Sequence, residues 1–424
     1  MANIILIVIA WIAPALAFAQ EDSIVVPEPA TLDLSFLIAE TMINNPEIQE
    51  ALSRWDALEA SAGTAGSLPY PELKFMQEEM PGFSFSEAMY SRLELMQTIP
   101  FPTKLSSRSE IAGRQAEHAH HDHLEVVNDV IARLRRAYFE LWFNQQNIVL
   151  DRENARLLGQ IESIARERFA LGSVSQQDVL RAQIERTAVA GDLISLRQKE
   201  LSSKAALMSI LNRPQHDTLG FAVIADTLSF DQNLDSLIAR ALQSRPMIQH
   251  ESLRVDEENS RLRLAKQEYL PDFTLGLERV TSPATGFNGW SVRAGITLPF
   301  APWTIGRVSA GVDEEAAMVN LTKASYDAAR LMVIANIRDL YYKSDALKKR
   351  LDLYRMGVLP QARQSLTLTL KSYSTGETDF LRLNEAFREY VNYTKEYFMT
   401  RMNFEVAVAD LEREVGVNSL SSSN

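Results

Sequence analysis

The sequence predicts a mainly α-helical fold with a small β part, built from one structural unit that occurs twice. The stretch "LIAETMINNPEIQ", which begins at Leu37, returns 200 residues later as "LIARALQSRPMIQ", which begins at Leu237. A repeat this long indicates two copies of a whole unit rather than a solenoid. Between these stretches, apolar residues recur at steps of three and four, as in helices. Four short segments alternate apolar with polar residues, as strands do.

The composition excludes several classes of function. The chain has 424 residues, of which 46% are hydrophobic, so it is long enough for more than one packed unit. Its net charge of −12 argues against a nucleic-acid partner, because such binding relies on Lys and Arg at the phosphates. It contains no cysteine, which excludes disulfides, thiolate metal sites, cysteine nucleophiles and a lipid anchor on cysteine.

Residues 1–19 are predicted to be a secretory signal peptide. An apolar run from Ile4 to Leu16 ends in Ala17-Phe18-Ala19, which is a small-x-small cleavage pattern. We expect the mature chain to begin near Gln20, although the segment before the run lacks Lys and Arg, so the true start codon stays open. Later segments never reach eighteen consecutive apolar residues, and we expect no transmembrane helix.

The mature chain is predicted to divide into two repeats and a short tail. The first repeat covers 20–215, with a hairpin at about 72–99 and long helices at about 104–171 and 176–212. The second repeat covers 216–417, with a hairpin at about 272–299 and long helices at about 305–359 and 379–415. Residues 418–424 are expected to be flexible.

The hairpins are predicted from alternation and from their proline boundaries. Trp290 and Val292 point to one face of a strand, while Ser291 and Arg293 point to the other. The two hairpins end in similar words, "TIPFP" and "TLPFAP", and proline ends a strand because it cannot donate to the ladder. Each hairpin also follows a proline, where a preceding helix must stop.

The long helices are predicted from uninterrupted spacing and from repeated turns. A helix over 104–171 would span about 100 Å. In the second repeat, a helical interruption is expected from Gly357 to Pro360. The turns "RFALGSVSQQDVLRAQ" and "SYSTGETDFLRLNEA" repeat at an offset of 204, and we expect Gly172 and Gly376 to form left-handed helix caps.

Four strands in one chain are too few to hide the edges of a closed sheet. Several chains, each contributing two hairpins, could close a barrel that leaves no edge. The long helices would then pack as a ring of paired coiled coils in line with the barrel.

With these elements placed, the chain resembles the TolC-like outer-membrane efflux family along essentially its whole mature length. The likeness lies in the pairs "NNPEI"/"SRPMI", "LPYPEL"/"YLPDF" and "IPFP"/"LPFAP", and in the two turns. Within the family, the wording "SVSQQDVLRAQ", the short length and the compact hairpin loops look most like the CzcC/CusC metal-exporting branch. Relatives in that branch are commonly anchored by a lipidated cysteine, which this chain lacks.

The resemblance implies a homotrimer with a twelve-stranded barrel in the outer membrane, continuous with an α-helical tunnel in the periplasm. It implies docking onto a periplasmic adaptor and an inner-membrane pump of the resistance-nodulation-division type. The chain would be a passive gated duct for heavy-metal cations. Two alternatives stay open: the same duct for drugs or other small organic compounds, and a soluble periplasmic coiled-coil adaptor. The proline-bounded strands and the duplication favour the channel.

The resemblance also implies a constriction just after the helical turns. The matching positions here are Asp178, Arg181, Arg382 and Glu385. Because both signs occur, cross-pairs such as Asp178 with Arg382 could hold the entrance shut; the alternative is an ordinary solvated helix start. The tips expected to dock the adaptor are Gly172, Ser173, Val174, Gly376, Glu377 and Thr378.

The stretch "EHAHHDH" is the other candidate site. Its histidines are His118, His120, His121 and His123. On a helix only pairs such as His118 with Asp122 share a face, and two ligands make a weak surface site. We expect a solvated patch that attracts metal ions rather than a specific metal site. His216 and His250 are interpreted as isolated surface or satisfied residues.

The remaining signals indicate a membrane interface and no catalysis. Five aromatic residues at the hairpin ends suit an interface belt, although core or trimer packing is nearly as good an explanation. They are Phe83, Phe85, Tyr90, Phe287 and Trp290. The chain has no HExxH, phosphate-binding glycine loop, G-x-S-x-G or dinucleotide fingerprint, so we expect neither an enzyme nor a cofactor.

Overall fold

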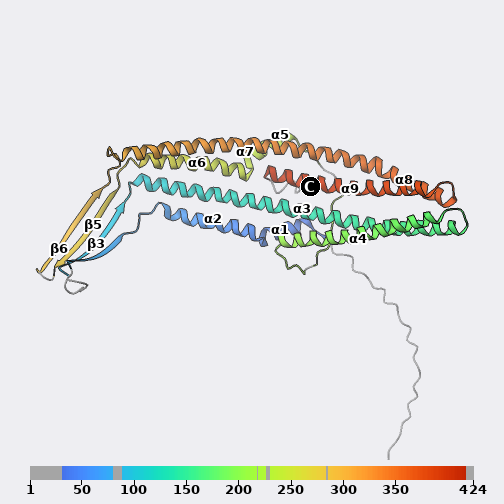
Figure 1. The fold of residues 1–424 in the computed structure, drawn as a ribbon. Helices are drawn as coiled ribbons and strands as arrows, with labels where there is room; N and C mark the ends of the chain where they lie inside the picture. The colour runs from blue at the N-terminus through green and yellow to red at the C-terminus, as the bar shows by residue number, and fades with distance from the viewer. Residues whose placement is uncertain (1–30, 80–87, 217, 226–229, 283–284, 417–424) are drawn as a thin grey trace, which may run out of the picture.

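The fold is elongated, with a β-sheet at one end and two helix–helix turns at the other (Figure 1). The computed structural model describes residues 31–79, 88–216, 218–225, 230–282 and 285–416. The expected signal peptide and tail, and the aromatic residues Phe83 and Phe85, lie outside the described residues.

The elements follow one another in the same order in both repeats, except that two helices, α7 and α8, joined by a short π-helical segment, take the place of α3 in the second repeat. The first repeat contains β1 (Thr31–Leu32), α1 (Leu34–Asn44), α2 (Pro46–Ala65), β2 (Glu72–Glu78), β3 (Tyr90–Ile99), α3 (Pro102–Ala170) and α4 (Gln176–Ile210). The second contains β4 (Phe221–Ala222), α5 (Leu234–Ser244), α6 (Pro246–Gln267), β5 (Phe273–Ser282), β6 (Phe287–Ile296), α7 (Ile305–Leu353), α8 (Leu359–Thr375) and α9 (Phe380–Val415). The predicted mainly helical fold with a duplicated unit is confirmed.

The duplicated stretch of sequence forms an elbow between two short helices. In the first repeat, Asn45 ends α1 and caps α2, its side chain accepting from the backbone N–H of Glu47 at 2.9 Å. Pro46 follows in the first turn, where no N–H is needed. The elbow of the second repeat has Arg245 and Pro246 at the same places.

Each elbow contacts the end of the second long helix of its own repeat. Asn45 donates from Nδ2 to the carbonyl of Ile210 at 2.7 Å, where α4 ends. Arg245 forms an ion pair with Glu414, one residue before α9 ends. The duplicated sequence motif therefore positions the end of a long helix in each repeat. The contact is a hydrogen bond in the first repeat and an ion pair in the second.

The two hairpins form a single antiparallel sheet in the order β2-β3-β5-β6. Its register aligns Leu73, Leu95, Leu277 and Val292 across the four strands. β2 and β6 are the outer strands of this sheet. Over the described ranges, the sheet of one chain is therefore open at both sides.

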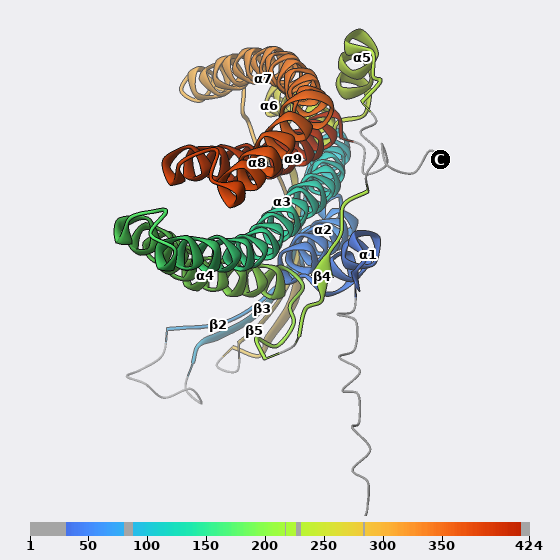
Figure 2. The same cartoon turned by 90° about the vertical axis from the view of Figure 1, so that its right-hand side faces the viewer.

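The long helices form a curved layer, with α1 and α5 on its convex side (Figure 2). α3 has 69 residues, which corresponds to about 100 Å, and it contacts α2, α4, α6 and α9 along its length. The buried residues form separate clusters along these helices, one of them at the turns. The packing suits an extended rod better than a single central core.

The predicted interruption and end of the helix over 305–359 need a correction. The helix does not stop at Leu359 but continues to Thr375 through a π-helical segment, Tyr354–Val358. There the N–H of Leu359 donates to the carbonyl of Tyr354, five residues back. The wider turn suits Pro360, which falls in the first turn of α8 and has no N–H to donate.

Two further features complete the fold. β1 and β4 pair in parallel and so join the starts of the two repeats, a contact that the sequence did not indicate. The Tyr138 hydroxyl lies beside both, 2.9 Å from the carbonyls of Leu32 and Val223. Along the described ranges, we find no helix with the length and apolar character needed to traverse a membrane.

Candidate functional site

One face of the sheet is largely apolar and exposed. The aligned row of Leu73, Leu95, Leu277 and Val292 lies on this face, and Val292 is 79% exposed. Other exposed apolar side chains of the same strands are Phe75, Leu93, Phe273, Leu275, Trp290 and Ile296. A surface of this kind is typical of contact with lipid or with another protein.

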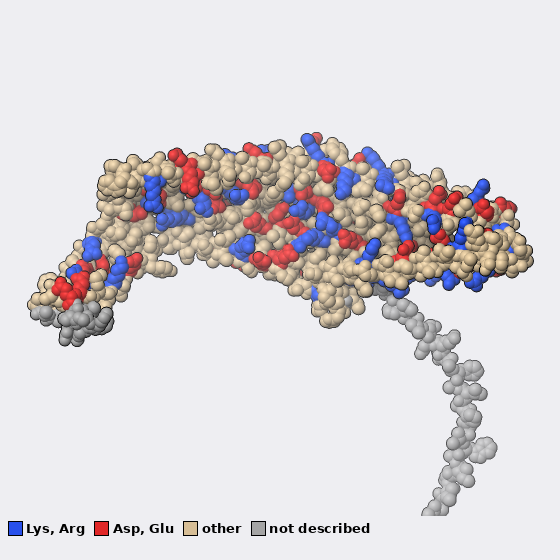
Figure 3. All heavy atoms as spheres, in the orientation of Figure 1, with Lys and Arg blue, Asp and Glu red and all other residues tan. Residues whose placement is uncertain are grey.

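The opposite face of the sheet carries a network of charges. Arg92 pairs with Glu78 at 3.1 Å and with Glu278 at 3.0 Å. Arg293 pairs with Glu94 at 2.6 Å and with Glu278 at 3.4 Å. Acidic and basic side chains gather at the sheet end in Figure 3. One face is therefore suited to water and the other to an apolar surrounding.

The two turns between the long helices have the same backbone geometry. The N–H of Ser173 donates to the carbonyl of Arg168, and the N–H of Glu377 donates to that of Ser372, both at 2.9 Å. Gly172 and Gly376 have φ angles of 70° and 89°. Both turns are the Schellman caps expected from the repeated glycine.

The turns are also joined to each other. Arg168 of α3 donates to the carbonyl of Tyr373 at 2.7 Å and lies over its ring, 4.8 Å from the centroid. The Tyr373 ring is fully buried and contacts Phe380 of α9 edge to face. A cluster from α3, α4, α8 and α9 surrounds them. The tips therefore form one packed end rather than two independent loops.

The structure places the predicted constriction residues around this end. Asp178 is half-buried and close enough to Tyr373 that its carboxylate adds to the rise in the Tyr373 pKa, which burial chiefly causes. Arg181, Arg382 and Glu385 are exposed. Within the described part of the chain, none of these four forms a side-chain ion pair, so the predicted Asp178–Arg382 pair is not formed inside one chain.

The predicted docking residues lie on the surface of the same end. Gly172, Ser173, Gly376 and Glu377 are exposed, while Val174 and Thr378 are half-buried. These positions leave the caps accessible to another molecule.

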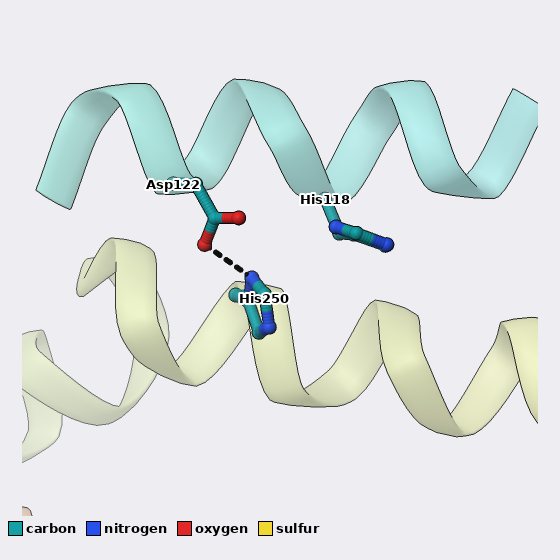
Figure 4. A group of neighbouring side chains, drawn as sticks. All are labelled: His118, Asp122 and His250. Atoms are coloured by element: carbon teal, nitrogen blue, oxygen red, sulfur yellow. Dashed lines mark ion pairs between the residues drawn. The ribbon is translucent and has the colours of Figure 1, made fainter. Parts of the chain in front are cut away.

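His250 is not isolated in space, which corrects the interpretation made from the sequence. It lies on α6 opposite α3, and its Nδ1 forms an ion pair with Asp122 Oδ1 at 2.6 Å (Figure 4). The Asp122 carboxylate raises the pKa of His250. His118, one turn before Asp122, has its ring centroid 5.0 Å from that of His250. The missing partner lay about 130 positions away, beyond any local pattern.

The other histidines of the cluster point elsewhere. His120 packs against Trp55 of α2, with ring centroids 4.4 Å apart. His123 is also near Trp55, at 6.4 Å. His120 and His121 line a pocket of about 460 Å³ together with Trp55. The four histidines all lie on α3, but they face different neighbours: His118 faces α6, whereas His120 and His123 face α2. His216 is exposed.

Comparison with known proteins decides which family this geometry belongs to. A sequence profile described as "Outer membrane efflux protein" matches residues 37–213 and 237–417. The chain belongs to the outer membrane efflux protein family. The two matched segments start 200 residues apart, which is the offset of the duplicated stretch at Leu37 and Leu237. They end 204 residues apart, which is the offset of the two turns.

Relatives and solved structures of this family cover nearly the whole chain. Outer membrane protein TolC of Vibrio cholerae serotype O1 is 20% identical over 397 residues, covering 89% of each chain. The outer-membrane channel OprN superposes with a TM-score of 0.77 at 17% identity, covering 90% of this chain and 89% of the other. CusC, described in connection with transmembrane channel formation, gives 0.78 at 15% identity, covering 91% and 92%.

Family membership fixes the location and the general role. The protein is an outer membrane efflux channel of the TolC type, with its helices extending into the periplasm, as the sequence predicted. The family and the fold are those of a channel rather than of an enzyme. The alternative of a soluble periplasmic adaptor gains no support from them.

Proposed function

We propose that three copies of this protein assemble into one export duct. Each copy contributes its four-stranded sheet to a twelve-stranded barrel, and its long helices to a tunnel in line with the barrel. The observation that carries the proposal is the open sheet: its outer strands β2 and β6 have no further partner strand among the described residues, and one of its faces is largely apolar. Closure by neighbouring copies satisfies both strands, turns the apolar face to lipid and leaves the charged face to water.

Fractionation tests the assembly. We expect a heat-sensitive trimer in the outer-membrane fraction, dissociating on boiling to a single chain that is lighter than the 47.7 kDa of the full sequence, because the predicted signal peptide is removed. A monomer in mild detergent, or recovery only with soluble periplasmic proteins, would contradict the proposal.

The packed helical end is the proposed entrance and docking surface. The exposed caps at Gly172 and Gly376 suit contact with a periplasmic adaptor, which would connect the duct to an inner-membrane pump of the resistance-nodulation-division type. Asp178, Arg181, Arg382 and Glu385 would form the constriction. Since these charges have no ion-pair partner within the described part of one chain, pairing across copies is available to them.

Single-channel recording tests the constriction. We expect the Asp178→Ala/Arg382→Ala double variant to conduct more than the parent, because the proposed cross-pair is removed. The matched control is Lys199→Ala, an exposed charge farther along α4. Equal conductance in the double variant and the parent would remove these residues from the gate.

The proposed cargo is a heavy-metal cation. Its support is the resemblance of the "SVSQQDVLRAQ" turn and the compact hairpin loops to the metal-exporting branch of the family. Deletion of the protein should increase sensitivity to zinc, cobalt, cadmium, copper or silver salts. Unchanged metal sensitivity with increased sensitivity to dyes and detergents would favour small organic compounds instead.

A further inference from the structure

A cluster of three residues joins the two repeats within the helical part of the molecule, near the end that carries the sheet. His118 and Asp122 lie one turn apart on α3, and His250 faces them from α6 (Figure 4). One potential ligand atom from each residue lies within 4.8 Å of the others. The cluster is about 25–30 Å along α3 from its start at Pro102, at 1.5 Å per residue.

The ion pair between His250 and Asp122 does not explain how the ring of His118 is oriented. Its Nε2 lies 3.3 Å from the Glu257 carboxylate. Its Nδ1 is buried and, among the described residues, has no hydrogen-bond partner. A carboxylate on one ring nitrogen with the other nitrogen left available is the arrangement that orients a metal-binding histidine.

Glu257 is itself held in place as a carboxylate. Gln115 donates to it at 2.8 Å and Arg261 donates to it at 2.6 Å. The group that orients His118 is therefore fixed in position by two donors besides the histidine.

We propose that His118, Asp122 and His250 bind one divalent first-row transition-metal ion, such as Zn²⁺, that links the two repeats. Two imidazoles and one carboxylate suit zinc, cobalt, nickel or copper, whereas calcium and magnesium prefer oxygen ligands alone. Metal–ligand distances near 2.1 Å require ligand atoms about 3.4 Å apart in a tetrahedron, so small side-chain rotations close the site.

All three proposed ligands are partly exposed to solvent. The side chains of His118 and His250 are 21% and 18% exposed, and that of Asp122 is 49% exposed. Ions can therefore enter from one side, and a fourth position stays open to water. The inference does not depend on the proposed cargo, because a duct for organic compounds would gain the same link between its helices.

Metal titration of the purified full-length protein in detergent tests the site. After treatment with a chelator, Zn²⁺ is added in competition with a chromophoric chelator. We expect one tight site per chain. His118→Gln and His250→Gln should each weaken it at least tenfold, and Glu257→Gln about 10–100-fold, since it acts through His118. Zn²⁺ should raise the melting temperature of the parent but not of these ligand variants.

Matched controls distinguish this site from general histidine binding. His120→Gln/His123→Gln removes the pair beside Trp55, and His216→Gln removes an exposed histidine; both should retain the parent affinity. Co²⁺ absorption on the parent reports nitrogen and oxygen coordination even where a variant fails to fold. Absence of a tight site in the parent, unchanged affinity in His250→Gln, or loss of the site in the His120/His123 control would overturn the proposal. These results are independent of the metal sensitivity of a deletion strain, so failure of this metal site can be distinguished from failure of the proposed cargo.

Discussion

Single residues with a left-handed backbone mark the ends of the long helices. Gly172 and Gly376 follow α3 and α8, and Gly416 follows α9. After α4 the corresponding residue is Asn212, with a φ of 55°. Asparagine is among the few non-glycine residues that tolerate this region. The repeat thus conserves a backbone geometry where it does not conserve the residue.

Alanine substitutions at these glycines should be costly in a defined order. Gly172→Ala should destabilise by about 1 kcal/mol, the cost of placing a Cβ at positive φ. Gly416→Ala should cost more, because its Cβ would also lie 2.8 Å from the Cα of Arg245. Thermal unfolding followed by circular dichroism measures both.

The control is Gly159→Ala inside α3, where a Cβ meets nothing within 4 Å. It should be neutral or stabilise by about 0.5–1 kcal/mol. A Gly172→Ala protein as stable as the Gly159→Ala protein would contradict the assigned cap.

Glu162 predicts an acid-dependent loss of stability near the tips. Its pKa is lowered by a hydrogen bond from Gln183, partly opposed by burial, and by Arg166 and Arg186. A folded pKa below the unfolded value of about 4.3 stabilises the protein above that pH. The contribution is lost as the pH falls through the folded pKa.

The Glu162→Gln variant should therefore melt at a lower temperature than the parent at pH 7, and the difference should shrink towards pH 3. Melting curves at several pH values measure it. A constant difference across this range would show that Glu162 does not act through its charge.

At the scale of elements, the elbow between α5 and α6 depends on a buried charge. Arg245 is 2% exposed and contacts Glu414 and, at 3.2 Å, Glu125. Glu414 also pairs with Arg413 at 3.0 Å and accepts from Asn336 at 3.3 Å. An unpaired charge in such a place is costly, whereas the pair itself contributes little relative to an apolar replacement.

Arg245→Leu alone should destabilise by about 3 kcal/mol, the low end for a broken buried pair, because the Glu414 carboxylate then keeps only Arg413 and Asn336 as partners. The Arg245→Leu/Glu414→Leu double variant should recover a large part of that loss. Denaturant unfolding of the two variants provides the comparison. If the double variant is less stable than the single one, the pair is a net source of stability.

The two faces of β6 should respond differently to charge. Val292→Lys places an ammonium on the exposed apolar face and should cost about 2–4 kcal/mol if that face meets the middle of the lipid layer. Ser291→Lys, one residue earlier, places it on the charged face beside Glu278, whose carboxylate lies 3.1 Å from the Ser291 hydroxyl. The amount of heat-sensitive trimer in the outer membrane should fall only for Val292→Lys; equal losses would contradict the assignment of the faces.

At the scale of the whole molecule, the open sheet makes one chain incomplete. β2 and β6 lie at opposite sides of a four-stranded sheet, about 14 Å apart at 4.8 Å per strand. Each needs a partner strand that the described part of this chain does not supply. Because the sequence has no cysteine, engineered pairs can report on neighbouring copies without background.

A Phe75→Cys/Val292→Cys variant should cross-link into a three-chain species with a reagent shorter than about 10 Å. Such a reagent is too short to join the two positions within one sheet at the spacing above. Gel electrophoresis after denaturation measures the product, with each single cysteine variant as control. If the reaction goes to completion and yields monomers alone, closure of the sheet by neighbouring copies is contradicted.

The sequence alone determined the duplicated unit, the approximate place of each strand and the glycine caps, although β6 ends at Ile296, three residues before the predicted limit of 299. These follow from local rules: periodicity, prolines after Ile99 and Leu298, and the glycines of the turns. The helix end at Leu359 was wrong, because proline signals a break while a π-helical turn accommodates it.

Only the tertiary structure decided which charged and polar groups meet. Glu278 lies between Arg92 and Arg293, and His250 lies beside His118 and Asp122. These partners belong to different strands or helices, in several cases more than a hundred residues apart, and no local pattern encodes them. The packing of α3 against α6 and the register of the sheet bring them together.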